Sequence, residues 1–262
     1  MKQNFHTAQE IVDRLRTADA EDFAVLERSL AADTRKTVRR AVESTRRRLE
    51  AASAEAERLA RLYAFQDEVA AGRLAVGLDE VGRGPPAGPV SVGAVVLPPE
   101  PRIAGLNDSK QLSPERREEL AAQIKETAIA WTVVHVEPRR IDEKGIVACL
   151  KAAFDQAVAA IEAAGTVPEV VLLDGNPLHF DPREVNIVKG DARCASISAA
   201  SIVAKVERDA LMSELDTRYP GYGFAHNKGY GSADHIAAIK ERGLSPVHRV
   251  SFCTAFTQDR LF

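Results

Sequence analysis

Two adjacent carboxylates, Asp79 and Glu80, follow the short apolar run 74–78 and precede a turn rich in glycine and proline. Neighbouring carboxylates that are removed from water repel each other and raise each other's pKa. A divalent cation relieves that repulsion, because hard cations such as Mg²⁺ prefer carboxylate oxygens as ligands. The pair is therefore a candidate metal site. The simpler alternative is an aspartate that caps a turn beside a solvated glutamate.

The turn after this pair contains Gly82, Arg83 and Gly84. Glycine lets the backbone approach a ligand closely, and the charged guanidinium of arginine suits phosphate or sugar oxygens. Apolar, Val-rich runs at 74–78 and 90–97 flank the turn, and they predict two strands joined by a structured loop. The two carboxylates are then expected where the first strand ends.

Two further aspartates follow apolar segments later in the chain. Asp174 ends the apolar run 170–173, and Asp191 is expected to open a helix, 192–218, whose small residues would let it lie close against a sheet. Acids at the ends of different strands can converge, because ligands of open α/β sheets bind beyond the carboxyl ends of the strands. A turn-forming Asp-Gly pair at 174 and an ordinary helix N-cap at 191 are the structural alternatives.

Several cationic and aromatic residues could contact nucleic acid. Lys110 precedes a predicted helix, and both lysine and helix N-termini attract anions. Lys205 and Arg208 could be solvated or could reach phosphates. Lys228 and Tyr230 lie where glycine alternates with aromatic residues, which suits a loop that stacks a ring on a base or sugar. A packed aromatic turn is the alternative for this stretch.

A series of motifs in this chain resembles, in order, the motifs of ribonuclease HII, the bacterial type 2 ribonuclease H. They are GLDEVGRG at 77–84, NDSKQL at 107–112, LDG at 173–175, KGD at 189–191 with SAASIVAKV at 198–206, KGYGS at 228–232, and PVHRVSF at 246–252. The resemblance covers roughly 72–252. It implies the ribonuclease H fold, a five-stranded mixed sheet flanked by helices. Asn227 and Ser232 depart from the family pattern, which often has histidine and threonine there.

The resemblance also implies an activity. The family's metal-binding carboxylates fall on Asp79, Glu80, Asp174 and Asp191, which would hold two Mg²⁺ or Mn²⁺ ions. The implied reaction is hydrolysis 5′ of a ribonucleotide in an RNA–DNA hybrid or in duplex DNA. It leaves a 3′-hydroxyl and a 5′-phosphate, and serves ribonucleotide removal and RNA primer degradation. The turn 82–84 would read the 2′-hydroxyl, which distinguishes RNA from DNA, and Tyr230 would contact the next deoxyribose.

Neighbouring side chains on an ideal strand point to opposite faces, so Asp79 and Glu80 can share a site only if the backbone bends there. The following glycines allow such a bend. A non-catalytic nucleic-acid-binding module on the same fold is the main alternative, and the presence of all four acids argues against it. A small-molecule phosphate enzyme is disfavoured, because no Gly-Lys-Ser/Thr pattern occurs and prolines replace the amides that would cradle a phosphate.

The first 71 residues are interpreted as a separate helical extension, and 72–262 as the catalytic domain with a small helical C-terminal part from about 219. The extension lacks glycine and proline before residue 72, and its composition favours helix. Thr7 and Glu10 predict a capping box at the start of the first helix.

The long third helix of this extension carries a heptad-like seam from Val38 to Tyr63. Thr and two Ala weaken that seam, so packing within the chain is favoured over a coiled-coil dimer, and a monomer is expected. The arginine-rich face of the same helix is either a solvated surface or a contact to duplex phosphates, which bind cations without sequence preference.

The composition limits the class of protein. A hydrophobic content of 45% supports a core, and a net charge of −3 gives no global attraction to nucleic acid. The three cysteines lie far apart without a Cys-x-x-Cys pair, so neither a zinc site nor a disulfide framework is indicated. The N-terminus shows no secretory signal, and no apolar run approaches the roughly 20 residues that span a membrane. A cytoplasmic protein without a membrane partner is expected.

The last five residues form a separate motif, Gln258-Asp259-Arg260-Leu261-Phe262. Gln-x-x-Leu-Phe at a chain end resembles the short peptide with which bacterial proteins dock on the sliding clamp. Gln258, Leu261 and Phe262 are therefore candidate partner-binding residues. The alternative is that Leu261 and Phe262 pack on the domain.

Overall fold

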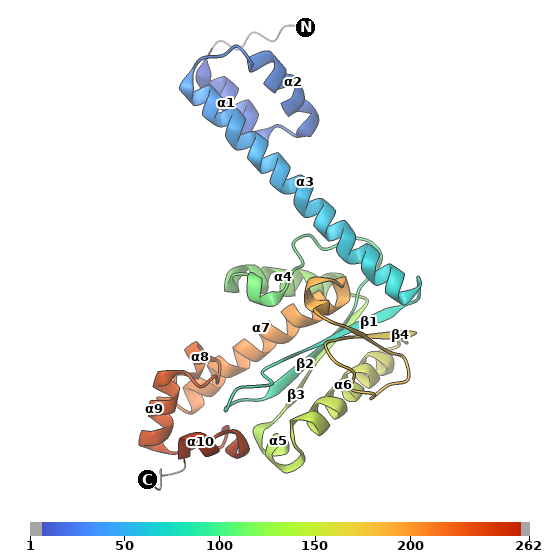
Figure 1. The fold of residues 1–262 in the computed structure, drawn as a ribbon, viewed down its shortest axis with the longest axis vertical. Coiled ribbons are helices and arrows are strands. Elements are labelled where there is room, and N and C mark those ends of the chain that lie inside the picture. Colours follow the sequence, from blue (N-terminus) through green and yellow to red (C-terminus); the bar gives the residue numbers. More distant parts are fainter. Residues whose placement is uncertain (1–6, 258–262) are drawn as a thin grey trace. The chain divides into compact units, whose positions relative to one another are not determined.

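The structure is a computed structural model that describes residues 7–257 (Figure 1). The chain divides into two compact units, one up to residue 60 and one from residue 61 onward. The division falls inside a single long helix, α3 (Lys36–Ala70). None of the helices in the described ranges has the length and apolar character needed to cross a membrane.

The first unit consists of α1 (Ala8–Thr17), α2 (Ala20–Leu30) and the first part of α3. Thr7 and Glu10 form the predicted capping box, in which each side chain accepts a backbone N–H of the other residue. Inward-facing side chains of the three helices form one small apolar core, made of Ile11, Leu15, Ala18, Phe23, Leu26 and Val38.

The seam predicted along α3 serves two different cores. Val38 and its neighbours pack against α1 and α2, whereas Tyr63 is buried in the second unit, where its hydroxyl accepts the Ile103 N–H at 3.0 Å. Ala52 and Ala56, in the middle of the seam, are exposed. Packing within the chain is thus confirmed at both ends of the seam, but the prediction of one continuous seam is wrong, because no helix of the first unit extends along its middle.

The second unit is built on a five-stranded sheet in the order β3-β2-β1-β4-β5. Its strands are β1 (Ala75–Val81), β2 (Val90–Val96), β3 (Ala130–Val136), β4 (Val170–Asp174) and β5 (Glu184–Ile187). β1, β2 and β3 pair antiparallel, while β4 and β5 run parallel to β1. This mixed sheet confirms the predicted fold class.

Helices cover both faces of the sheet (Figure 1). α5 (Pro138–Lys144) and α6 (Ile146–Ala163) pack against one face, and α4 (Pro114–Thr127) and α7 (Ala195–Arg218) lie on the other. The small residues of α7 allow a close approach, as predicted. A Cβ on Gly77 would lie 2.2 Å from the backbone of Ser196, and one on Gly93 would lie 2.4 Å from the carbonyl of Ala200.

The C-terminal part is a small helical cluster, as predicted. It contains α8 (Phe224–Asn227), α9 (Ala233–Arg242), a 3-10 turn (Val250–Phe252) and α10 (Thr254–Thr257). Its apolar side chains pack around the end of α7 through Met212 and Leu215. This packing brings the loop between α8 and α9 next to the loop between β1 and β2.

Candidate functional site

Asp79 and Asp174 lie side by side on the sheet face that α7 covers. Gly77 and Leu78 pair with residues 172 and 173 of β4, so the next step along both strands brings Asp79 level with Asp174. Asp79 is only 7% exposed, and its carboxylate accepts the N–H of Glu80 at 2.8 Å and a hydrogen bond from Ser201 on α7. The parallel pairing of β1 and β4 therefore brings together two of the four predicted acids.

Glu80 lies inside the strand rather than after its end. Pairing of β1 with β2 continues regularly through Val81, so the bend expected at the two acids comes later, at Gly82, whose φ is +80°. Strand alternation turns the Glu80 side chain away from that of Asp79. Its carboxylate accepts a hydrogen bond from Arg83 at 3.3 Å. The prediction that the two acids lie where the first strand ends is correct to within one residue, because ladder hydrogen bonds to β2 extend the strand only to Val81.

Asp191 does not open the long helix. It is a buried residue of a 3-10 turn, Gly190–Ala192, and α7 begins only at Ala195. The left-handed backbone of Lys189 starts this turn, which delays the helix. The N–H of Gly190 donates to Asp174 at 2.6 Å, so the turn holds Asp191 next to Asp174.

The four acids are coupled electrostatically. Burial raises the pKa of Asp79 well above its ordinary value, and repulsion from the other three carboxylates adds to the shift. Burial also raises the pKa of Glu80 and of Asp174, and the negative charge of Asp191 raises the pKa of Asp174 further. A carboxylate held in its charged form here needs a nearby positive charge.

The chemistry of these side chains fits a divalent cation. They offer carboxylate oxygens, which Mg²⁺ and Mn²⁺ prefer. Two cations face them: Lys110, whose Nζ lies 3.6 Å from Asp191, and Arg83 beside Glu80. Two positive charges against four carboxylates leave an excess of negative charge. Within residues 7–257, however, no three acidic, histidine or cysteine side chains converge closely enough to hold one ion in the arrangement described.

The side chain of Arg249 holds the backbone of the glycine-rich turn that follows β1. This side chain is fully buried, and it donates to the carbonyls of Gly82 at 2.6 Å, Arg83 at 2.8 Å and Gly88 at 3.0 Å. The guanidinium thereby supplies donors to three backbone carbonyls of the irregular turn, and the bonds to Gly82 and Gly88 are buried. Arg249 belongs to the last motif of the sequence, but no pattern in the sequence indicated this contact.

Arg208 of α7 holds the same turn against the loop that carries Tyr230. It is fully buried and donates to the carbonyls of Pro89 at 2.9 Å and Lys228 at 3.0 Å. A Cβ on Gly82 would lie 2.1 Å from its Nε, so this position requires glycine. The prediction that Arg208 is solvated or reaches phosphates is wrong. Its spacing of four from Ala204 places it on the helix face that packs against the sheet.

The other predicted substrate-binding residues differ in how free they are. Lys205 forms an ion pair with Asp209 of its own helix at 2.6 Å, and the Lys228 amino group donates to the Asp209 carbonyl at 3.4 Å, so both lysines have a partner at Asp209 of α7. Lys110 is exposed beside the acids, and the ring of Tyr230 is half exposed. Lys110 therefore lies beside the acids, whereas Lys205 and Lys228 already have partners within the fold.

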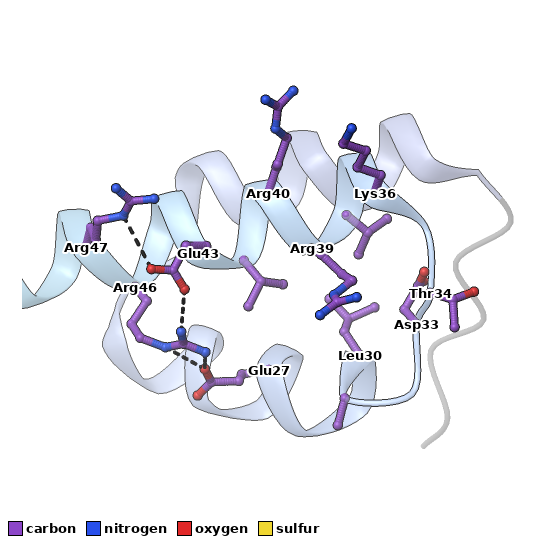
Figure 2. Close-up of a pocket in the computed structure, with 13 residues that line it drawn as sticks. Glu27, Leu30, Asp33, Thr34, Lys36, Arg39, Arg40, Glu43, Arg46 and Arg47 are labelled. Atoms are coloured by element: carbon purple, nitrogen blue, oxygen red, sulfur yellow. Dashed lines mark hydrogen bonds and ion pairs between the residues drawn. The ribbon is translucent and has the colours of Figure 1, made fainter.

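A second feature lies in the helical unit, where a groove of about 900 Å³ runs between the end of α2 and the start of α3 (Figure 2). Arg46 crosses the groove and pairs with Glu27 and Glu43. Cationic side chains from one face of α3 dominate the lining, which includes Lys36, Arg39, Arg40, Arg46 and Arg47.

The candidate partner-binding residues Gln258, Leu261 and Phe262 lie outside the described residues.

Comparisons with known proteins agree with this geometry. The family model described as ribonuclease HII matches residues 76–255, and the ribonuclease HII N-terminal domain matches residues 7–70. A ribonuclease HII of Lachnoclostridium phytofermentans is 44% identical over 250 residues, which cover 95% of this chain and 97% of the relative. A ribonuclease HII of Levilactobacillus brevis is 42% identical over 225 residues, 86% of each chain.

Solved structures show the same fold. The ribonuclease HII of Archaeoglobus fulgidus, solved in a complex with PCNA, has a TM-score of 0.59 and 29% identity, and the match covers 68% of this chain and 94% of that one. The ribonuclease H2 of Pyrococcus horikoshii has a TM-score of 0.58 and 27% identity, with 71% and 99% covered. Together with the arrangement of the acids at the sheet, these matches show that the chain belongs to the ribonuclease HII family.

Proposed function

We propose that this protein is an endoribonuclease that hydrolyses the phosphodiester 5′ of a ribonucleotide in RNA–DNA hybrids and in duplex DNA, leaving a 3′-hydroxyl and a 5′-phosphate. Family membership supports the reaction class. One observation carries the assignment of the site. Asp79 is a buried carboxylate whose pKa is raised by burial and by Asp174, Glu80 and Asp191, an arrangement that is costly without cations.

The four acids would hold two divalent cations. Asp79 and Asp174 would supply carboxylates from neighbouring parallel strands, and Asp191 would supply one from the 3-10 turn. Glu80, whose side chain points away from that of Asp79, would join them only after it leaves Arg83 and turns toward the other acids. When bound, Mg²⁺ or Mn²⁺ supplies positive charge that makes a water molecule more acidic and neutralises the charge that develops on the leaving oxygen. Lys110 is exposed next to Asp191 and would contact the phosphate of the substrate.

The backbone of the turn 82–84 would recognise the 2′-hydroxyl. Its carbonyls at Gly82 and Arg83 already accept from Arg249, so the turn is rigid before substrate arrives. A rigid turn loses little conformational entropy when it binds the sugar. The exposed ring of Tyr230 would pack on the next deoxyribose. Lys205 and Lys228, which both have a partner at Asp209, would contact phosphates only after exchanging that partner.

The experiment that tests this function uses a labelled DNA duplex with one embedded ribonucleotide, assayed with Mg²⁺, with Mn²⁺ and with EDTA. We expect a metal-dependent cut on the 5′ side of the ribonucleotide. In Asp79→Asn the rate should fall by about 10³-fold or more, because the substitution removes a charged ligand of the reacting centre. Asp155→Asn, the same change on the exposed surface of α6, should cut like the wild type.

The alternative function, a non-catalytic nucleic-acid-binding module, predicts binding without cutting under every metal condition. Cutting that survives Asp79→Asn would instead show that the reaction uses another site. Electrophoretic mobility shift of the same duplex with both proteins separates these two outcomes.

Two further predictions concern the cellular setting. The tail 258–262 is proposed to dock on the sliding clamp, and a pull-down in which its deletion leaves clamp binding unchanged would contradict this. A complex with PCNA is described for the Archaeoglobus fulgidus relative, which supports a protein partner of this kind. The three cysteines are buried and form no disulfide among the described residues, which supports the prediction of a reducing, cytoplasmic setting.

A further inference from the structure

The loop that presents Tyr230 is held through its backbone. The Tyr230 carbonyl accepts two hydrogen bonds, one from the N–H of Ser232 at 2.8 Å and one with Nδ1 of His235 at 2.8 Å. The Tyr230 ring itself is half exposed. The carbonyl group is thus fixed while the aromatic face remains available to a ligand.

His235 does not act alone. Its Nε2 lies 3.0 Å from Nε2 of His248, and Nδ1 of His248 accepts the backbone N–H of Ser245 at 2.9 Å. Both rings are buried, with exposures of 0% and 3%. A continuous row of hydrogen bonds therefore runs from Ser245 through two imidazoles to the carbonyl of Tyr230.

The two ends of this row determine where every proton lies. A backbone N–H can only donate, so Nδ1 of His248 carries no proton and its Nε2 does. The Tyr230 carbonyl can only accept, so His235 carries its proton on Nδ1 and accepts from His248 with Nε2. Both rings are then neutral, each in one tautomer, and each hydrogen bond has one donor and one acceptor.

The surroundings keep the pair neutral. The rings of Tyr222 and Phe224 pack against the imidazoles, with centroids 4.9 Å from His248 and 5.3 Å from His235 respectively. Burial lowers the pKa of both histidines, and together with the neighbouring His235 it lowers the pKa of His248 to about 4. Protonation of either ring would place a donor against a donor.

We propose that His235 and His248 are positioning residues for Tyr230, which set the height and direction of its ring at the edge of the active site. This inference rests on the proposed function, in which Tyr230 contacts the deoxyribose beside the ribonucleotide. It assigns the pair a role in choosing substrates that contain an RNA–DNA junction, because a displaced ring cannot test the sugar that follows the ribonucleotide.

The kinetic test compares cleavage of a duplex with one embedded ribonucleotide to cleavage of a continuous RNA–DNA hybrid. We expect His235→Leu to lower the preference for the single ribonucleotide about tenfold, since it removes the hydrogen bond to Tyr230. His235→Asn keeps an N–H in the place of Nδ1 and should recover most of the preference. His226→Leu, on the exposed surface of α8, should leave the preference unchanged.

A Tyr230→Ala background separates positioning from general damage. If the pair acts through Tyr230, His235→Leu should change the preference no further in this background. A further loss of the same size there, or an unchanged preference in a folded His235→Leu protein, would overturn the inference. If Tyr230→Ala alone leaves the preference unchanged while cutting continues, the proposed sugar contact fails instead.

A second measurement does not depend on the folding of any variant. Correlation of the imidazole ¹⁵N and ring ¹H signals in the wild-type protein at pH 7 reports the tautomer of each histidine. We expect His235 with its proton on Nδ1 and His248 with its proton on Nε2. The opposite tautomer in either ring, or an imidazolium, would contradict the row of hydrogen bonds.

Discussion

The two units of this protein use cationic side chains in opposite ways. In the helical unit, Lys36, Arg39 and Arg40 are exposed on the first turns of α3, where Lys36 and Arg40 point away from the groove and Arg39 points into it (Figure 2), and none has an ion-pair partner among the described residues. In the sheet unit, Arg208 and Arg249 are fully buried and donate to backbone carbonyls of irregular loops. Arginine thus carries a surface charge in the helical unit, whereas in the sheet unit it forms buried hydrogen bonds that hold loops together.

The comparison shows that the positive charge of an arginine does not predict whether its side chain is buried as a hydrogen-bond donor or exposed at the surface. The buried pair supplies several rigid donors where two loops meet, which suits the planar guanidinium. The exposed group instead concentrates positive charge at the positive end of a helix dipole, an arrangement that an anion would relieve. The predictions below test this division, from the largest effect to the smallest.

Replacement of Arg249 by leucine should destabilise the sheet unit by about 3–5 kcal/mol, because three backbone carbonyls lose their donor and two of these hydrogen bonds are buried. The free energy of unfolding from denaturant titration measures this loss. Arg40→Leu is the matched change in the helical unit and should leave the unfolding transition nearly unchanged. Equal losses of unfolding free energy for the two substitutions would contradict the distinction between a buried arginine that holds loops together and an exposed one that only carries charge.

Gly82→Ala should destabilise the protein by about 3 kcal/mol, because φ is positive there and the new methyl group meets Arg208. Gly84→Ala is the matched control for stability: its backbone has no such restriction, and nothing lies within 4 Å of the new atom. Thermal denaturation compares the two proteins. A Gly82→Ala protein as stable as Gly84→Ala would show that Arg208 does not define the turn.

Acid should weaken the histidine pair that supports Tyr230. The pKa of His248 is about 4 in the folded protein, below the ordinary value of 6.5. As the pH falls, His248 therefore binds a proton in the unfolded chain before it does so in the folded protein. Its contribution to the free energy of unfolding is full above pH 6.5 and is lost as the pH drops toward 4. Between pH 7 and pH 5 this amounts to about 2 kcal/mol.

His248→Gln removes this titration and serves as the comparison. It should be less stable than the wild type at pH 7, but its stability should fall less between pH 7 and pH 5. Denaturant titrations at both values measure the difference, since all other groups titrate in both proteins. Parallel losses would show that His248 is not neutral in the folded state.

The smallest effect on stability is expected for the exposed cations. Replacing Lys36, Arg39 and Arg40 together by glutamine should shift the melting temperature by less than about 2 °C, because no described contact is lost. Duplex binding should weaken, and the slope of log K against log salt should fall by up to about 2.7 if all three meet phosphates. Fluorescence anisotropy with a labelled hybrid at several salt concentrations measures this slope. An unchanged slope would show that Lys36, Arg39 and Arg40 contact solvent and not the phosphates of the duplex.

Much of the architecture could be predicted from local patterns. Apolar runs separated by glycine and proline predicted the strands, and the small residues after Asp191 predicted a helix close against the sheet, where Gly77 and Gly93 now touch it. Thr7 and Glu10 predicted a cap that the structure confirms. These features depend on neighbours within a few residues, so the sequence alone contains the necessary information.

Other features depended on partners far along the chain. The bend expected at Asp79 and Glu80 moved to Gly82, because pairing with β2 holds the strand straight. The start expected for the long helix moved past Asp191, because the 3-10 turn hydrogen-bonds to Asp174 across 16 residues. Each correction arises where a long-range hydrogen bond outweighs a local preference.

The sequence by itself determined which acids and glycines are the candidate site residues and which family the chain resembles, since each of these belongs to a short motif of consecutive residues. Only the tertiary structure decided which cations are buried and which protons the histidines carry. Arg249 meets Gly82 across 167 residues, and His235 meets His248 across 13. A buried guanidinium or imidazole must satisfy its hydrogen bonds wherever the fold offers partners, and those partners exist only after the chain has folded.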